Sequence, residues 1–260
     1  MDTTVIARSI ETKQSIETGL PRSLTVVRND KILPIYDVTP FTMLDFPGKC
    51  AAIIWFSGCN MRCGYCHNPQ IVKGKGTQGI ADIFTFLKKR KGLLDGIVLS
   101  GGEASIYPGL PGFAACVKDM GYAIKLDTNG TRPDLVQSFL DQGLLDYVAL
   151  DYKAPPEKFK TVTGIEKFQA FEKTLDLLCT QTIVPFEIRT TVHTALMEER
   201  DISAIINDLE SRDYKGSYYI QNYINNGGPT LGMLPSQERT LDLSVLPTNK
   251  KFSIEFRNFP

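Results

Sequence analysis

Short apolar runs of strand length alternate with amphipathic segments of helix length along most of the chain. The runs, which predict strands, cover 50–56, 96–99, 123–126, 147–150, 186–192 and 218–222, and 252–256 has the pattern of a further strand. The segments between them have apolar residues at helical spacing, over 80–90, 113–120, 133–142, 167–180 and 200–209. Apolar strands separated by helices predict a parallel sheet that helices cover.

The number of strand-and-helix units predicts an α/β fold with an incomplete (β/α)6 barrel. Six units in about 190 residues are too few for eight-fold closure, which takes about 250 residues. An open doubly wound sheet is the alternative, but polar residues gather at the carboxyl ends of successive strands, and that edge is the functional rim of a barrel. Residues 1–34 are polar without periodicity and are interpreted as an N-terminal extension of a single domain over 35–260.

Charge and hydropathy narrow the classes of partner. The 29 Lys and Arg residues equal the 29 Asp and Glu residues in number, so no broad basic field favours nucleic acid or an anionic membrane surface. The sequence has no apolar run of roughly 18 residues and no charged-then-apolar leader. We therefore expect a soluble cytoplasmic protein, in which cysteines bind a metal or carry out redox chemistry more often than they form disulfides.

Three of the six cysteines form a C-x3-C-x2-C triplet directly after the first predicted strand. Such spacing lets a short loop point several thiolates at one centre, as zinc and iron-sulfur clusters both require. A structural zinc site would need a fourth ligand, for which His67 or Cys50 is available. The alternative is a four-iron cluster with one iron left free for a substrate or cofactor. The remaining cysteines are scattered singly and predict packing residues rather than a second cluster: Cys50, Cys116 and Cys179.

The order of two motifs resembles the radical S-adenosylmethionine (radical SAM) enzymes, over roughly residues 36–225. The C-x3-C-x2-C loop follows the first strand, and Gly101-Gly102-Glu103 follows the second. A sharper resemblance links the chain to activating enzymes of glycyl-radical proteins, in particular those of the anaerobic ribonucleoside-triphosphate reductase. It is carried by the segments TMLDFPGK (42–49) and GCNMRCGYCHNP (58–69). The family usually has Pro after the glutamate, where this chain has Ala104.

The resemblance implies an oxidoreductase with a [4Fe-4S] cluster held by Cys59, Cys63 and Cys66. The fourth iron of the cluster would bind the amino and carboxylate groups of S-adenosyl-L-methionine. One electron from the cluster would split the cofactor into methionine and a 5′-deoxyadenosyl radical, which would remove a hydrogen atom from a glycine of the partner enzyme. No catalytic side chain beyond the cluster and cofactor is expected, because the cofactor carries the hard chemistry.

The resemblance also implies that residues at the strand ends bind the cofactor. Tyr65 is expected against the adenine. Gly101 and Gly102 would let the main chain approach the cofactor, and Glu103 would accept its amino group. Asp127 and Thr128, with Asn129, offer oxygens to the ribose hydroxyls and the methionine end. Asp151 and Lys153 would lie near the charged groups of the cofactor. Arg189 would pair with the carboxylate of the cofactor.

Each of these assignments has a structural alternative. Tyr65 is also compatible with loop packing, and Asp127 and Thr128 with capping of a turn. Asp151 and Lys153 are compatible with an exposed ion pair. The remaining alternatives are a structural partner for Arg189, either Glu187 or Asp151, and a packing role for His193.

The predicted function is activation of anaerobic ribonucleotide reductase, with a flavodoxin- or ferredoxin-type reductant as second partner. A compact barrel with an open mouth suits a protein substrate inserted as a loop. Alternatives within the superfamily are activation of pyruvate formate-lyase or another glycyl-radical enzyme, and a small-molecule enzyme such as 7-carboxy-7-deazaguanine synthase. The alternative from a different class is a zinc-binding interaction module without turnover.

Overall fold

The computed structural model describes residues 33–225, 228, 230–248 and 251–260. The extension assigned to residues 1–34 therefore lies outside the described residues, apart from its last two. Leu33 is buried, and the main-chain N–H of Ser57 donates to the carbonyl of Pro34 at 2.8 Å. These two residues are thus joined to the sheet.

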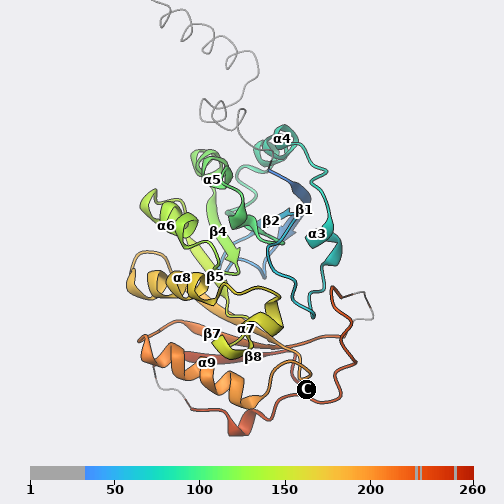
Figure 1. The fold of residues 1–260 in the computed structure, drawn as a ribbon. Coiled ribbons are helices and arrows are strands. Elements are labelled where there is room, and N and C mark those ends of the chain that lie inside the picture. Colours follow the sequence, from blue (N-terminus) through green and yellow to red (C-terminus); the bar gives the residue numbers. More distant parts are fainter. Residues whose placement is uncertain (1–32, 226–227, 229, 249–250) are drawn as a thin grey trace, which may run out of the picture.

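Eight strands form one curved sheet in the order of the chain (Figure 1). They are β1 (Ile35–Thr42), β2 (Ala51–Phe56), β3 (Gly96–Gly101), β4 (Ala123–Thr128), β5 (Tyr147–Asp151), β6 (Phe186–Val192), β7 (Ser217–Asn222) and β8 (Ser253–Arg257). Strand β1 pairs antiparallel with β2, and every later pair is parallel. Because the order begins at β1 and ends at β8, the barrel is incomplete. The predicted fold class is confirmed, and the antiparallel edge strand β1 is an addition to it.

The helices cover the outer face of this sheet (Figure 1). The five predicted helices are confirmed as α4 (Ile80–Arg90), α5 (Leu110–Asp119), α6 (Pro133–Asp141), α8 (Phe168–Thr180) and α9 (Glu199–Ser211). Two short helices were not predicted, α3 (Pro69–Lys73) and α7 (Pro156–Thr163). Each begins on a proline, which is tolerated in the first turn because that N–H has no partner within the helix.

Apolar packing closes one end of the barrel interior and leaves the other end polar. The main core lies between the helices and the sheet, and a smaller cluster fills the interior around Phe46, Ala51, Ile53 and Val98. The ring of Phe46 lies 6.3 Å from that of Tyr147. This cluster sits toward the amino ends of the parallel strands, so a cavity is left at their carboxyl ends. Within the described ranges, no helix is both long enough and apolar enough to cross a membrane.

Candidate active site

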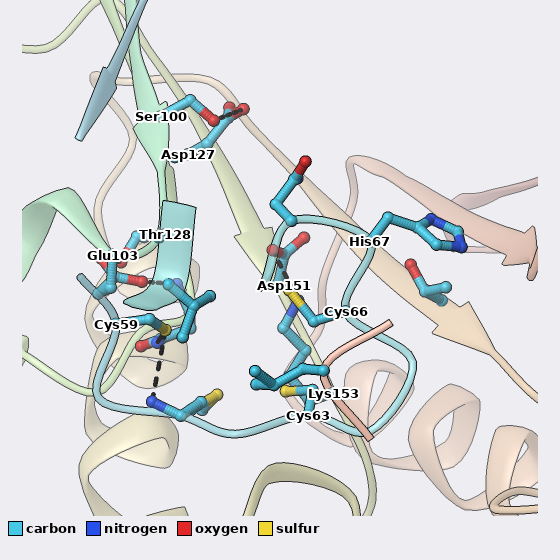
Figure 2. Close-up of a pocket in the computed structure, with 18 of the residues that line it drawn as sticks. Cys59, Cys63, Cys66, His67, Ser100, Glu103, Asp127, Thr128, Asp151 and Lys153 are labelled. Atoms are coloured by element: carbon cyan, nitrogen blue, oxygen red, sulfur yellow. Dashed lines mark hydrogen bonds and ion pairs between the residues drawn. The ribbon is translucent and has the colours of Figure 1, made fainter. Parts of the chain in front are cut away.

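A cavity of about 230 Å³ lies at the carboxyl ends of β2 to β6 (Figure 2). Its walls come from the loop after β2, the ends of β3 and β4, and the strands β5 and β6. The residues that the resemblance implies as cluster ligands or cofactor contacts all line it: Cys59, Cys63, Tyr65, Cys66, Gly101, Gly102, Glu103, Asp127, Thr128, Asn129, Asp151, Lys153 and Arg189. Parallel strands end at one edge of a sheet, and this edge therefore collects residues that are far apart in the chain.

The cysteine loop is folded by hydrogen bonds to its own main chain. The guanidinium of Arg62 donates to the carbonyls of Cys59, at 2.6 Å, and Met61, at 2.7 Å. The N–H of Met61 donates to Cys59 Sγ at 3.3 Å, and the N–H of Cys66 donates to the carbonyl of Cys63 at 3.1 Å. The loop therefore curves around the cavity and presents three thiols to it, as Figure 2 shows.

Two of the thiols are costly to ionise without a cation. Burial, with a smaller contribution from the nearby Glu103, raises the pKa of Cys59 to about 12. Burial also raises the pKa of Cys63 above its usual range. Metal ligation requires the thiolate, so a bound cationic centre has to supply the charge that displaces these protons.

The arrangement fits a cluster better than a single zinc ion. Among the described residues, no three His, Cys, Asp or Glu side chains come close enough together to hold one metal ion. In an iron-sulfur cluster each thiolate binds a different iron, so the three sulfurs stay farther apart. Cys50 precedes β2 at the opposite end of the strand and donates its N–H to Asp95. His67 lines the cavity, and its ring packs against that of Tyr223 with the centroids 4.7 Å apart and the rings tilted by 34°.

The Gly-Gly-Glu segment is pressed against the start of the cysteine loop. The N–H of Gly102 donates to the carbonyl of Phe56 at 2.8 Å, and that of Glu103 to the carbonyl of Gly58 at 2.9 Å. A Cβ on Gly102 would overlap the carbonyl of Gly58. Glycine is therefore required for the close approach of the two main chains that form this wall.

The carboxylate of Glu103 is a buried hydrogen-bond hub. It is 2% exposed and accepts from the N–H and hydroxyl of Ser105, at 3.1 and 2.5 Å. It also accepts from the hydroxyl of Thr128, at 2.8 Å, and the N–H of Asn129, at 2.6 Å. Burial raises the pKa of this carboxyl, although these donors oppose the rise. The side chain thus ties the end of β3 to the end of β4 and forms cavity wall at the same time.

Five charged side chains run in a row from β4 to the segment after β5. Lys125 Nζ lies 2.6 Å from Asp127 Oδ1, and Asp127 Oδ2 lies 3.6 Å from Arg189 Nη2. Arg189 Nε lies 3.1 Å from Asp151 Oδ1, whose other oxygen accepts from Lys153 Nζ at 2.9 Å. Arg189 thus has both structural partners that the alternative interpretation named, Asp151 and, at 3.8 Å, Glu187. The Asp151–Lys153 pair is largely buried instead of exposed, with side-chain exposures of 26% and 18%.

The row shifts the pKa values of its members. Burial alone would raise the pKa of Asp151, but Lys153 and Arg189 outweigh it and hold that pKa below its usual range. Burial alone would lower the pKa values of Lys153 and Arg189, but the neighbouring carboxylates raise both. All three groups are therefore charged at neutral pH, which gives the cavity fixed charges of both signs.

The remaining residues that the sequence predicted differ in whether their polar atoms have hydrogen-bond partners. Tyr65 is 5% exposed, and its buried hydroxyl has no hydrogen-bond partner among the described residues. Thr128 accepts the N–H of Gly130 at 3.1 Å, so it also stabilises the turn after β4. His193 packs its ring against Tyr223, with the centroids 4.7 Å apart, and is absent from the cavity lining.

Several residues at or beside the cavity were not individual candidates in the sequence, and three of them interact with the site residues or complete the cavity wall. Ser100 donates to Asp127 Oδ2 at 3.1 Å, and Leu231 lines the cavity from a segment far along the chain. Lys125 lies within a predicted apolar strand and was not considered as a site residue, although it is two residues before Asp127. Side chains two apart on a strand share a face, and this spacing is the signal that identifies it.

Comparison with known proteins places these features in a family. The model of the radical SAM superfamily matches residues 53–209. A Methanocaldococcus jannaschii protein named "Putative glycyl-radical enzyme activating enzyme" is 33% identical over 196 residues, which cover 72% of this chain and 78% of that protein. The pyruvate formate-lyase-activating enzyme of Clostridium pasteurianum is 26% identical over 68% of this chain and 77% of its own.

Similarity to other members is narrower or limited to the fold. The 7-carboxy-7-deazaguanine synthase of Methanopyrus kandleri is 27% identical over 42% of this chain and 52% of its own. The solved structure of anSMEcpe with bound AdoMet superposes with a TM-score of 0.53 at 20% identity, covering 65% of this chain and 49% of that one. That superposition supports the same fold for the two chains.

Proposed function

The chain belongs to the radical SAM superfamily, among the activating enzymes of glycyl-radical enzymes, and we propose that its protein substrate is the anaerobic ribonucleoside-triphosphate reductase. Members of this superfamily use a [4Fe-4S] cluster and S-adenosyl-L-methionine. We assign the cluster to Cys59, Cys63 and Cys66, on the fit of three thiols, one buried and two partly buried, that line one cavity.

The [4Fe-4S] cluster, when bound, would supply the electron that cleaves S-adenosyl-L-methionine to methionine and a 5′-deoxyadenosyl radical. The side chains and main chain of the cavity would bind and orient the cofactor. The Gly101-Gly102 main chain and Glu103 form the wall for the amino group. Asp127 and Thr128 offer acceptors for the ribose. The further contacts are Tyr65 at the adenine and the charged groups of Asp151, Lys153 and Arg189 at the carboxylate end. A partner loop inserted at the open end would exclude water from the cavity, which protects a reactive radical from side reactions.

One observation carries the activase function: the assigned residues, drawn from segments between 59 and 189, line one cavity at the carboxyl ends of the strands. The choice of target rests on the 42–49 lead-in and the 58–69 loop, which resemble the reductase activases. Phe46 of the lead-in packs inside the barrel, in the apolar cluster at its amino end. The barrel stays incomplete, which suits entry of a loop of the partner from the polar end.

Two further candidates have specific support. The similarity to pyruvate formate-lyase-activating enzymes favours that lyase as the second candidate substrate. The similarity to 7-carboxy-7-deazaguanine synthases covers less than half of the chain, and we therefore rank a small-molecule substrate after a protein one. For the physiological setting we propose the cytoplasm and a flavodoxin- or ferredoxin-type reductant.

Isotope transfer tests the choice of target. The reductase is produced with deuterium on the Cα of its glycines and mixed anaerobically with the activase, S-adenosyl-L-methionine and reduced flavodoxin. The proposal expects deuterium in the released 5′-deoxyadenosine, and none when pyruvate formate-lyase labelled in the same way replaces the reductase. Deuterium from the lyase alone would reassign the substrate, and unlabelled 5′-deoxyadenosine from both mixtures would exclude both targets.

A further inference from the structure

Residues 230–234, here called the strap, lie against the half of the cysteine loop that carries Cys63 and Cys66. The N–H of Leu231 donates to the carbonyl of Cys66 at 3.0 Å, and the N–H of Gly232 donates to the carbonyl of Gly64 at 2.9 Å. In Figure 2 the C-terminal part of the chain, drawn in pale red, passes beside this loop. The strap lies outside the region that the family model matches.

The two main chains approach each other closely. A Cβ on Gly232 would lie 2.7 Å from the Cα of Gly64 and 3.1 Å from its carbonyl oxygen, so a side chain there would push the strap away. Thr230 donates its hydroxyl to the carbonyl of Gly232 at 2.7 Å, which holds the strap in a turn. Leu234 packs over Gly64, and Leu231 lines the cavity.

Both flanks of the strap are fixed to the rim of the barrel. Before it, the N–H of Tyr223 donates to the carbonyl of Val192 at 2.9 Å, and the ring of Tyr223 packs against the rings of both His67 and His193. After it, Gln237 accepts from the N–H of Thr194 at 3.1 Å and donates to Asn222 Oδ1 at 2.7 Å. The strap is thus supported by the ends of β6 and β7.

The two halves of the cysteine loop are held by different parts of the protein. The half around Cys59 is bonded to the barrel, since Asn60 donates to the hydroxyl of Thr131 at 2.6 Å and accepts from Asn129 at 2.9 Å. For residues 63–66, the hydrogen bonds that arrive from outside the loop come from the strap alone, as far as the described residues show.

We propose that the strap is a positioning element for the cluster: it holds Cys63 and Cys66 in ligating geometry, and Leu231 completes the cofactor cavity. This inference rests on the cluster assignment of the proposed function and goes beyond it, because it gives the C-terminal segment a role. Buried ligands need supporting contacts that fix their orientation, and loss of such contacts weakens a metal site without removing a ligand.

Three substitutions test the proposal in full-length, anaerobically reconstituted protein. Gly232→Ala displaces the strap, Thr230→Val removes the hydroxyl that supports its turn, and Met233→Ala is the matched control because Met233 is fully exposed beside them. The readouts are the rate of iron release to a chelator and the electron paramagnetic resonance spectrum of the reduced cluster with and without S-adenosyl-L-methionine. Both are independent of any partner enzyme.

We expect Gly232→Ala to release iron about fivefold faster, as for the loss of one hydrogen bond, and to alter the spectrum. We expect Thr230→Val also to release iron faster than the wild-type protein and to alter the spectrum. This variant keeps the test decisive if Gly232→Ala does not fold. Leu231→Ala keeps the N–H but removes cavity wall, so it weakens cofactor binding about threefold to fivefold while iron release stays unchanged.

Unchanged iron release and spectra in both strap variants, with only a lower melting temperature, would overturn the proposal. Wild-type protein that holds no four-iron cluster would overturn the cluster assignment and the strap together. Variants that behave as expected, in a protein that produces no glycyl radical on the reductase, would leave the strap standing and reject the target alone.

Discussion

Glu103 accepts the main-chain N–H of Asn129 at 2.6 Å, which joins the end of β3 to the end of β4 inside the protein. Replacement by Gln keeps the shape but puts an NH2 group where one carboxylate oxygen accepts. A buried donor left unsatisfied costs about 1–3 kcal/mol. We expect Glu103→Gln to lower the free energy of unfolding of the apoprotein by that amount in urea titrations. Glu157→Gln, at an exposed position on α7, is the matched control, and equal stability of the two variants would contradict the hub role.

Asp151 gives a prediction on pH. Its folded pKa is depressed, so its contribution to stability is complete above the ordinary aspartate pKa of about 3.9 and is lost as the pH falls through the lower folded value. Asp151→Asn removes this contribution. The melting temperature of the apoprotein should therefore be lower in the variant near neutral pH, and the difference should shrink as the pH falls below about 4. A difference that stays the same at every pH would refute the assignment. Asp119→Asn, at an exposed position at the end of α5, is the matched control.

Lys125 and Asp127 should be energetically coupled. The lysine side chain is 2% exposed and the aspartate 15%. Removing Lys125 leaves the buried carboxylate of Asp127 with only the Ser100 hydroxyl and the longer contact to Arg189, at a cost of up to about 3–5 kcal/mol, whereas removing both partners is much less costly. Lys125→Met should therefore destabilise the apoprotein more than Lys125→Met combined with Asp127→Asn. A double-mutant cycle in urea measures the coupling. The exposed pair Lys160 and Glu166 supplies the control cycle, and additivity at both pairs would contradict the prediction.

The cysteine assignment predicts paired losses. Cys63→Ala should abolish the brown cluster and cleavage of S-adenosyl-L-methionine together, while wild-type protein holds about four irons per chain. Cys179→Ala, on α8 away from the cavity, should retain both. Iron analysis and chromatography of 5′-deoxyadenosine provide the measurements. Cleavage by Cys63→Ala would mean that the ligands are wrongly assigned, and stoichiometric zinc without iron after anaerobic purification would favour the interaction module.

Local patterns were sufficient for the parts of the site that lie next to strand ends. The cysteine loop follows the apolar run of β2, and Glu103 and Asp151 come at or just after the ends of their strands. Since parallel strands carry their ends to one edge, the gathering of these residues could be predicted before any distance was known.

Other features depend on tertiary contacts that no local pattern encodes. Lys125 and Asp127 lie two apart on β4, but the burial of the lysine and the link from Asp127 to Arg189 of β6 exist only in the folded protein. Strand β1 contains Pro40 and half-exposed positions, so its pattern is weak, and pairing with β2 defines it. The strap is polar, irregular chain in the sequence, and its contact with Gly64 exists only in the folded protein.

The most direct test of the function is electron paramagnetic resonance of the reductase after anaerobic incubation with this protein, S-adenosyl-L-methionine and a strong reductant. Our account predicts the doublet of a glycyl radical on the reductase, its loss when Cys63→Ala replaces the wild-type protein, and its absence when the reductase glycine is replaced by Ala. A spectrum without a glycyl radical, from a mixture in which 5′-deoxyadenosine is released, would contradict the assignment of the reductase as substrate.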